Sequence, residues 1–250
     1  MLKTDWVLKA EFRMEAIRKA AENELEALKR DFPHWPPDDA RRCAIMRLAS
    51  MLFVPVVSLY TMRIHMADPA WWEQYAQGDG NDLADYGRTA FDKGIRGKLI
   101  MDLVGNSEHS FRLILNQLDP ANEASKFATI CQSLFRATNP HLSSVPADWE
   151  PTIKLLRLMR NTIHTAWAYF PDNGKNATVI FKGNKYEFIV GEPLNFVSWD
   201  LLGEISENLF QILNAVVRDA NVVPLPTIKD FGAEQAPPAT HSTTPSPAVP

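Results

Sequence analysis

Cysteine is scarce in this sequence, and there is no excess of positive charge. Only two of the 250 residues are cysteines, Cys43 and Cys131, and both lie in segments of helical pattern. We interpret them as buried thiols of a protein in a reducing compartment, because two distant cysteines provide neither a disulfide framework nor a metal site.

The formal net charge is −4, so no overall positive field is present to hold a long nucleic acid. Any contact with nucleic acid must therefore be local.

A long uninterrupted apolar segment is also missing. The first 30 residues contain Lys, Arg and Glu throughout, so we expect no export signal. The most apolar stretch, residues 49–60, contains Pro55 and is flanked by Arg47 and Arg63. It is shorter than the roughly 20 residues that span a bilayer. We predict a kinked core helix there, a cytoplasmic protein and no membrane partner.

The sequence motifs of common enzyme classes are absent. There is no Walker A loop, no G-x-G-x-x-G, no G-x-S-x-G and no H-E-x-x-H. None of the six histidines has a second histidine or a cysteine at the spacing of metal ligands. We therefore expect no metal site and no cofactor.

Helical periodicity is the strongest pattern that is present. With 46% hydrophobic residues, the chain can bury a substantial core. Apolar residues recur at helical spacing in 5–30, 38–66, 98–118, 121–137, 149–169 and 198–219, and Gly105 indicates a break that divides 98–118 into two helices. Two β-branched and aromatic runs, 178–181 and 185–190, flank Gly183 and Asn184 and predict a hairpin. The predicted fold class is all-α, a multi-helix bundle with a small β-hairpin inserted before the last helix.

We expect one helical domain over residues 1–221, followed by a tail over 222–250. Seven of the 18 prolines follow Asn221, together with many serines and threonines and a single aromatic residue, Phe231. Such a composition buries too little apolar surface to offset the entropy lost on ordering. We therefore predict a disordered C-terminal tail.

The predicted helix over 149–169 carries four polar side chains on one side. Counting about 100° per residue from Arg157, Arg160 lies at about −60°, Asn161 at about +40° and His164 at about −20°. All four share one arc, and the opposite face is apolar and suited to docking on a core. The apolar face consists of Leu155, Leu156, Leu158, Met159, Ile163, Ala166 and Trp167.

These residue types suit the cleavage of RNA without a metal. A histidine such as His164 takes up or releases a proton near neutral pH, and guanidinium groups such as those of Arg157 and Arg160 bind phosphate in a bidentate manner. Asn161 can hydrogen-bond a phosphate or orient the imidazole. In this chemistry a base removes the proton of the ribose 2′-hydroxyl, which attacks the adjacent phosphate. One histidine cannot act as acid and base in a concerted step, but a symmetric dimer would supply a second one.

The combination of Arg160, Asn161 and His164 on the long helix before a strand pair and a closing helix resembles the HEPN superfamily. That family is recognised by an arginine, usually followed by a polar residue such as asparagine, and a histidine a few positions later. The resemblance covers residues 98–219, with 1–97 as an N-terminal helical extension packed on that core. It implies a homodimer through the 149–169 helix and a metal-independent endoribonuclease site. It also implies RNA binding and a role in toxin–antitoxin or antiviral defence, with an antitoxin or assembly partner.

The spacing of the motif leaves open which arginine binds phosphate. The family usually has four to six residues between arginine and histidine, whereas three residues separate Arg160 from His164. Counting from Arg157 gives six, but the next residue is then Leu158 rather than a polar one. We therefore predict Arg160, Asn161 and His164 as catalytic residues and Arg157 as a substrate-binding residue.

A noncatalytic helical interaction or dimerisation module is the alternative hypothesis. An arc of arginine, asparagine and histidine opposite an apolar face also occurs on an ordinary solvated helix. In that case the arc of the 149–169 helix is either a polar dimer seam or plain surface.

Overall fold

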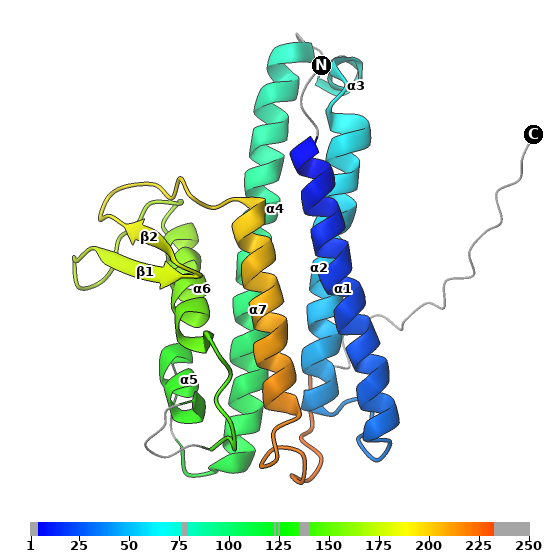
Figure 1. Ribbon diagram of the computed structural model, residues 1–250. Coiled ribbons are helices and arrows are strands. Elements are labelled where there is room, and N and C mark those ends of the chain that lie inside the picture. The colour runs from blue at the N-terminus through cyan, green and yellow to red at the C-terminus, as the bar shows by residue number, and fades with distance from the viewer. Residues whose placement is uncertain (1–4, 77–79, 123, 125, 136–140, 233–250) are drawn as a thin grey trace, which may run out of the picture.

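Long helices lie side by side in a bundle, and a small β-hairpin stands on one side of it (Figure 1). The computed structural model describes residues 5–76, 80–122, 124, 126–135 and 141–232. The predicted all-α bundle with a hairpin before the last helix is confirmed. The long helices are α1 (Asp5–Asp31), α2 (Ala40–Thr61), α4 (Gly80–Leu118) and α7 (Trp199–Val217). The shorter elements are the π-helical turn Met62–Met66, α3 (Pro69–Ala76), α5 (Phe127–Phe135), α6 (Trp149–His164), β1 (Ala177–Phe181) and β2 (Asn184–Phe188).

A single apolar core joins the long helices. Helix α1 buries Val7, Met14 and Ala21, which recur every seven residues on its inner face. The predicted division at residue 97 falls inside α4, and side chains from both parts, such as Met14 and Leu209, belong to the same core. The described elements therefore share one hydrophobic interior.

Helix α4 is continuous where the sequence predicted two helices. Its 39 residues run through Gly105, Asn106 and Ser107 without a break. The Asn106 side chain donates to the backbone oxygen of Ala44 at 3.0 Å, and the Ser107 hydroxyl donates to that of Leu103 at 2.7 Å. Because these side chains donate to oxygens without displacing the helical hydrogen bonds, they do not interrupt the helix as such residues do at helix caps. The predicted break at Gly105 is wrong.

The predicted β-hairpin is confirmed, with its turn one residue earlier. The two strands are antiparallel, with Phe181 opposite Asn184, and the turn consists of Lys182 and Gly183. Both turn residues have positive φ, +47° and +79°, which suits the twist of a two-residue hairpin. Phe181 and Phe188 are buried and join the hairpin to the core.

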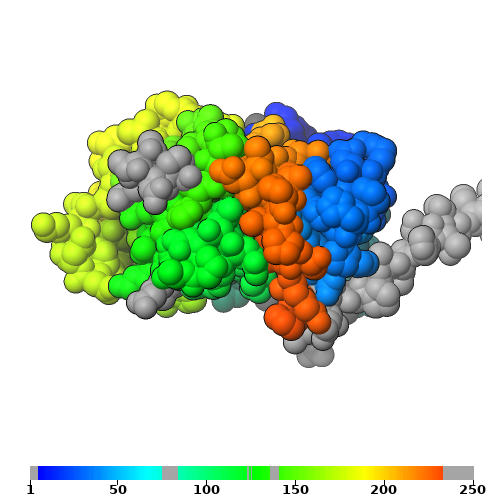
Figure 2. All heavy atoms as spheres, turned by 90° about the horizontal axis from the view of Figure 1, so that it is seen from below, coloured from blue at the N-terminus to red at the C-terminus, as the bar shows by residue number. Residues whose placement is uncertain are grey.

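The segment after α7 packs against the bundle instead of forming part of a disordered tail. Val222 and Ile228 are buried, and the segment runs across the lower end of the bundle, beside the α1–α2 connection (Figure 2). The backbone of Ile228 pairs with that of Ala40, and Asp39 forms an isolated bridge with Lys229. The predicted boundary of the tail at residue 222 is therefore wrong for 222–232. Residues 233–250 lie outside the described residues.

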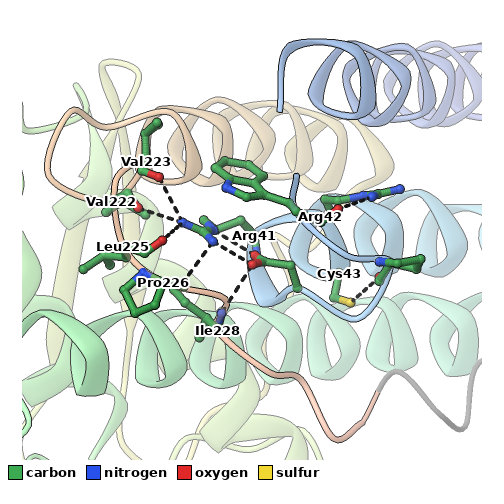
Figure 3. Close-up of polar contacts among 11 residues, drawn as sticks. Arg41, Arg42, Cys43, Val222, Val223, Leu225, Pro226 and Ile228 are labelled. Atoms are coloured by element: carbon green, nitrogen blue, oxygen red, sulfur yellow. Dashed lines mark hydrogen bonds and ion pairs between the residues drawn. The ribbon is translucent and has the colours of Figure 1, made fainter. Parts of the chain in front are cut away.

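A buried arginine explains why 222–228 is ordered. Arg41 is completely buried, and its guanidinium binds both carboxylate oxygens of Asp39 at 2.8 and 2.6 Å. It also donates to backbone oxygens of the segment (Figure 3). These acceptors are Val222 (2.9 Å), Val223 (3.2 Å), Leu225 (3.1 Å) and Pro226 (3.3 Å). Besides burying Val222 and Ile228, this loop is thus held by hydrogen bonds from a charged donor, which are stronger than neutral ones.

A second polar cluster fixes the end of the segment. Asp230 is buried and accepts from Arg47 of α2 at 2.5 Å and from His109 of α4 at 3.0 Å. Arg47 also donates to Asn106 at 2.9 Å and to Ser110 at 3.2 Å. These bonds join the C-terminal segment to two long helices.

Helix α2 and the π-helical turn run on as one long apolar helix, Ala40–Met66. Ala40–Met66 is long and apolar enough to cross a membrane by length and composition, and half of its most apolar window is buried within the bundle. A buried core helix of a soluble protein passes the same test. Pro55 is buried inside this helix, in the stretch predicted to be a kinked core helix.

Candidate active site

Helix α6 ends at His164, five residues before the predicted end. The helix stops because the backbone N–H of Trp167 turns back to the carbonyl of Thr162 at 2.9 Å. Ala166 and Trp167 have φ of +57° and +70°, a left-handed conformation that no regular helix contains. His164 therefore lies in the last turn of α6, and the following residues are free to fold beside it.

The chain after α6 forms a wall opposite the polar arc. Arg157, Asn161 and His164 line one cleft of about 440 Å³. Its other lining residues are Leu158, Thr165, Tyr169, Phe170, Pro171, Asp172 and Asn173. The structure thus brings together three of the four predicted site residues.

Arg160 is the predicted site residue that lies apart. It is half-buried and is not among the residues that line the cleft. On a helix, residues 157, 161 and 164 follow each other at +4 and +3 and share a narrow arc, whereas Arg160 lies about 100° from Asn161. The cleft therefore contains Arg157, the arginine separated from His164 by six residues.

The charge of Arg157 acts on the interior of the cleft. Arg157 is half-buried, whereas Asn161 and His164 are exposed. Burial raises the pKa of the Tyr169 phenol above its ordinary value, and the positive charge of Arg157 opposes this rise. Tyr169 therefore stays protonated at neutral pH and is a hydrogen-bond donor beside a cation.

Sequence reasoning missed the wall residues of the cleft. Tyr169 falls within the predicted helix, and the sequence pattern assigns no role to Pro171, Asp172 and Asn173. Phe170 is 59% exposed and lines the cleft, where it presents an apolar ring beside the polar side chains. A run of aromatic and turn residues directly after the motif helix was the available signal.

The two cysteines are buried and free, as predicted. Burial raises the pKa of the Cys43 thiol to about 11, and burial also raises the pKa of Cys131. The reactive form of cysteine is the thiolate, so neither side chain is suited to nucleophilic catalysis at neutral pH. In the described part of the chain, no three His, Cys, Asp or Glu side chains lie close enough to hold a metal ion.

The chemistry available in the cleft is that of a proton carrier beside a guanidinium. A histidine can exchange protons at neutral pH, and an arginine can hold an anion such as phosphate. Comparisons of the chain with protein-family models, curated proteins and solved structures found no match. The functional argument therefore depends on the residues of the cleft.

Proposed function

We propose that this protein is a HEPN-like, metal-independent endoribonuclease with its site in the α6 cleft. The observation that carries the proposal is that Arg157, Asn161 and His164 line a single cleft of about 440 Å³. A cleft of this volume is within the range that accommodates small ligands. It is large enough to receive a nucleotide unit of an RNA strand.

In the proposed reaction His164 acts as the general base. It removes the proton of a ribose 2′-hydroxyl, whose oxygen then bonds to the adjacent phosphorus while the bond from phosphorus to the 5′-oxygen breaks. Arg157 binds the phosphate oxygens and stabilises the charge that develops on them, and Asn161 donates a further hydrogen bond. The products are a 2′,3′-cyclic phosphate and a 5′-hydroxyl end.

The proposal includes a homodimer through the 149–169 region, because the leaving 5′-oxygen needs a proton donor. The exposure of His164 and Asn161 on the surface of α6 leaves them accessible to a second copy of the helix. A twofold axis beside α6 would bring the partner's imidazole to the same phosphate as the general acid. The proposed setting is the cytoplasm, in toxin–antitoxin or antiviral defence, where an antitoxin or assembly partner would control the activity.

The test is cleavage of mixed RNA in EDTA by the purified full chain. We expect His164→Ala to lower the rate about 10²–10⁴-fold, the usual contribution of general acid–base catalysis. Arg157→Ala is expected to lower it about 10²–10³-fold through lost charge stabilisation. Arg160→Ala is the matched control on the same helix and should retain most of the activity.

A DNA substrate is the control, and the His164→Ala variant defines the outcome that would contradict the proposal. DNA of the same sequence must remain intact, because it lacks the attacking 2′-hydroxyl. Equal absence of cleavage in the wild-type protein and in His164→Ala would contradict catalysis by the free protein.

A noncatalytic dimerisation module is the second candidate. It is favoured by one observation: within the described chain, no hydrogen bond joins Arg157, Asn161 and His164 to one another. Absence of cleavage together with a dimer that Asn161→Arg dissociates would support this module instead of the enzyme.

A further inference from the structure

Exposed apolar side chains are concentrated along the outside of α2 and the π-helical turn. Phe53, Val57, Tyr60 and Ile64 are 54%, 44%, 49% and 45% exposed. We call these four residues the α2 stripe. Soluble monomers rarely expose contiguous large apolar side chains, and such patches mark interaction surfaces.

The α2 stripe has the spacing of a coiled-coil seam. Its members follow each other at +4, +3 and +4, the pattern by which one helix docks lengthwise on another. Phe53, Val57 and Tyr60 lie in α2, where about 100° per residue places them within an arc of about 60° over about 10 Å, and Ile64 continues the row in the π-helical turn. The stripe therefore fits a helical partner better than a small ligand.

The charges on the α1 side of the stripe are neutralised within the chain. Arg63 binds Glu11 at 2.9 Å. Arg18, whose guanidinium lies 6.0 Å from the ring centre of Phe53, binds Glu15 at 2.7 Å. An anionic membrane or a nucleic acid selects surfaces with unpaired cations. Because Arg63 and Arg18 are already paired with carboxylates, the α2 stripe favours an apolar partner of little net charge.

The other neighbours of the stripe on α2 carry no charge. They include Ser50, Val54, Val56 and Thr61, so α2 itself would bring no like charges together if two copies of this surface met. The core of protein interfaces is depleted of charged residues in the same way.

The order of side chains along the stripe is self-complementary. If two stripes lie antiparallel about a twofold axis midway between Val57 and Tyr60, Phe53 faces the partner's Ile64. Val57 then faces the partner's Tyr60. Every pair combines one aromatic with one β-branched residue, which fills space more evenly than two rings or two short side chains facing each other.

We propose that the α2 stripe binds the same stripe of a second copy of this chain, with the two α2 helices antiparallel. The proposal is independent of the ribonuclease proposal, because α6 and the hairpin lie on the side of the bundle away from α1 and α2 (Figure 1). A contact through α2 therefore leaves the α6 cleft and any contact through α6 unobstructed.

The test is sedimentation equilibrium of the full chain over a concentration series. The wild-type protein is expected to form particles larger than the 28.2 kDa chain. Tyr60→Glu places a charge in the seam and should raise the dissociation constant of this contact about 100-fold or more. Ile180→Glu is the matched control, because Ile180 is a similarly exposed apolar residue on β1, and this variant should associate like the wild type.

Three outcomes would overturn the proposal. A wild-type protein that stays at the mass of one chain has no such contact. A Tyr60→Glu variant that associates like the wild type, with loss only in the α6 variant Asn161→Arg, would assign association to α6 alone. Flotation of a monomeric wild-type protein with phosphatidylglycerol vesicles, lost in Tyr60→Glu, would assign the stripe to lipid. Val57→Asp provides a second variant if Tyr60→Glu loses its helical circular dichroism.

Oxidative cross-linking tests the antiparallel orientation. Val57→Cys mixed with Tyr60→Cys should give a covalent dimer, whereas each variant alone should give little. The native Cys43 and Cys131 are buried and do not compete. A dimer formed as readily by Val57→Cys alone would contradict the antiparallel arrangement.

Discussion

Arg41 is the residue whose role is least apparent from its neighbours in sequence. It lies at the start of an apolar helix, yet its side chain is completely buried, and the Trp35 ring covers its guanidinium at 4.0 Å. Asp39 neutralises its charge, and backbone oxygens of the segment after α7 accept hydrogen bonds from its other N–H groups. A buried charge is tolerated only when it is paired and hydrogen-bonded in this way.

Replacing Arg41 is expected to be strongly destabilising. Arg41→Met removes the donor while keeping an apolar stem, and leaves the Asp39 carboxylate and several carbonyls buried without their partner. We expect the free energy of unfolding to fall by about 3–5 kcal/mol, the usual cost of breaking a buried pair. Urea denaturation measures this change. Arg30→Ala, at an exposed arginine, should change the free energy by less than about 0.5 kcal/mol, and a similarly small effect at Arg41 would contradict the role assigned to it.

At the scale of elements, the end of α6 creates the cleft. A helix that continued to residue 169, as predicted, would carry Tyr169 on its own surface and leave the polar arc without an opposite wall. The chain instead turns at Ala166 and Trp167, and the Trp167 ring packs on α4 beside Gly97. The absence of a side chain at Gly97 makes room for this ring, so α4 helps to fix where α6 ends.

Two glycines of α4 provide a matched test of this packing. A Cβ at Gly97 would lie 2.9 Å from the Trp167 ring, whereas a Cβ at Gly94 meets no atom within 4 Å. Gly94→Ala should raise the free energy of unfolding by about 1 kcal/mol, because alanine favours a helix over glycine. Gly97→Ala should lack this gain and shift the fluorescence of Trp167, seen by comparison with Trp167→Phe. Equal stabilisation by both alanines would show that the ring does not depend on Gly97.

At the scale of the whole molecule, the segment over 222–232 joins the C-terminal end of the described chain to α2 and α4. It contacts the start of α2 through Asp39 and Arg41, and it contacts α4 through His109 and Asp230. These bonds connect positions more than 100 residues apart. Such contacts stabilise the fold only after the bundle has brought the partners together.

Asp230 makes this connection sensitive to acid. Burial raises the pKa of Asp230. The hydrogen bonds from His109 of α4 and Arg47 of α2 together lower it by more, so the pKa lies below the ordinary value. Cys43 of α2 is a further titratable group near this carboxylate. The stabilisation is complete above the ordinary aspartate pKa of about 3.9 and is lost as the pH falls through the lower folded value.

We expect the free energy of unfolding of the wild type and of Asp230→Asn to differ at neutral pH. The difference should stay constant down to about pH 4 and shrink below it, because protonation removes the charge that the variant lacks. Urea denaturation over an acidic pH series measures this. A difference that persists unchanged at the lowest pH would contradict the assignment.

The helical wheel predicted the site in part. It placed Arg157, Asn161 and His164 on one arc, and the structure groups them in one cleft. It could not separate Arg160 from them, because the part of a polar arc that lines a cleft depends on which other elements pack beside the helix. The aromatic wall was missed because Trp167 continues the apolar spacing of the helix in the sequence. In the structure its backbone φ is +70°, so the chain has already left the helix.

The sequence by itself determined the helices, the hairpin and the burial of both cysteines, because these follow from local periodicity, turn residues and composition. Only the tertiary structure decided that α4 runs on through Gly105, that α6 stops at His164 and that 222–232 is ordered. Each of these depends on a partner distant in the chain, Ala44 for Asn106, Gly97 for Trp167 and the last loop for Arg41. Local propensity amounts to about 1 kcal/mol per residue or less, whereas buried packing and buried charge pairs amount to several, so the distant contacts prevail where the two disagree.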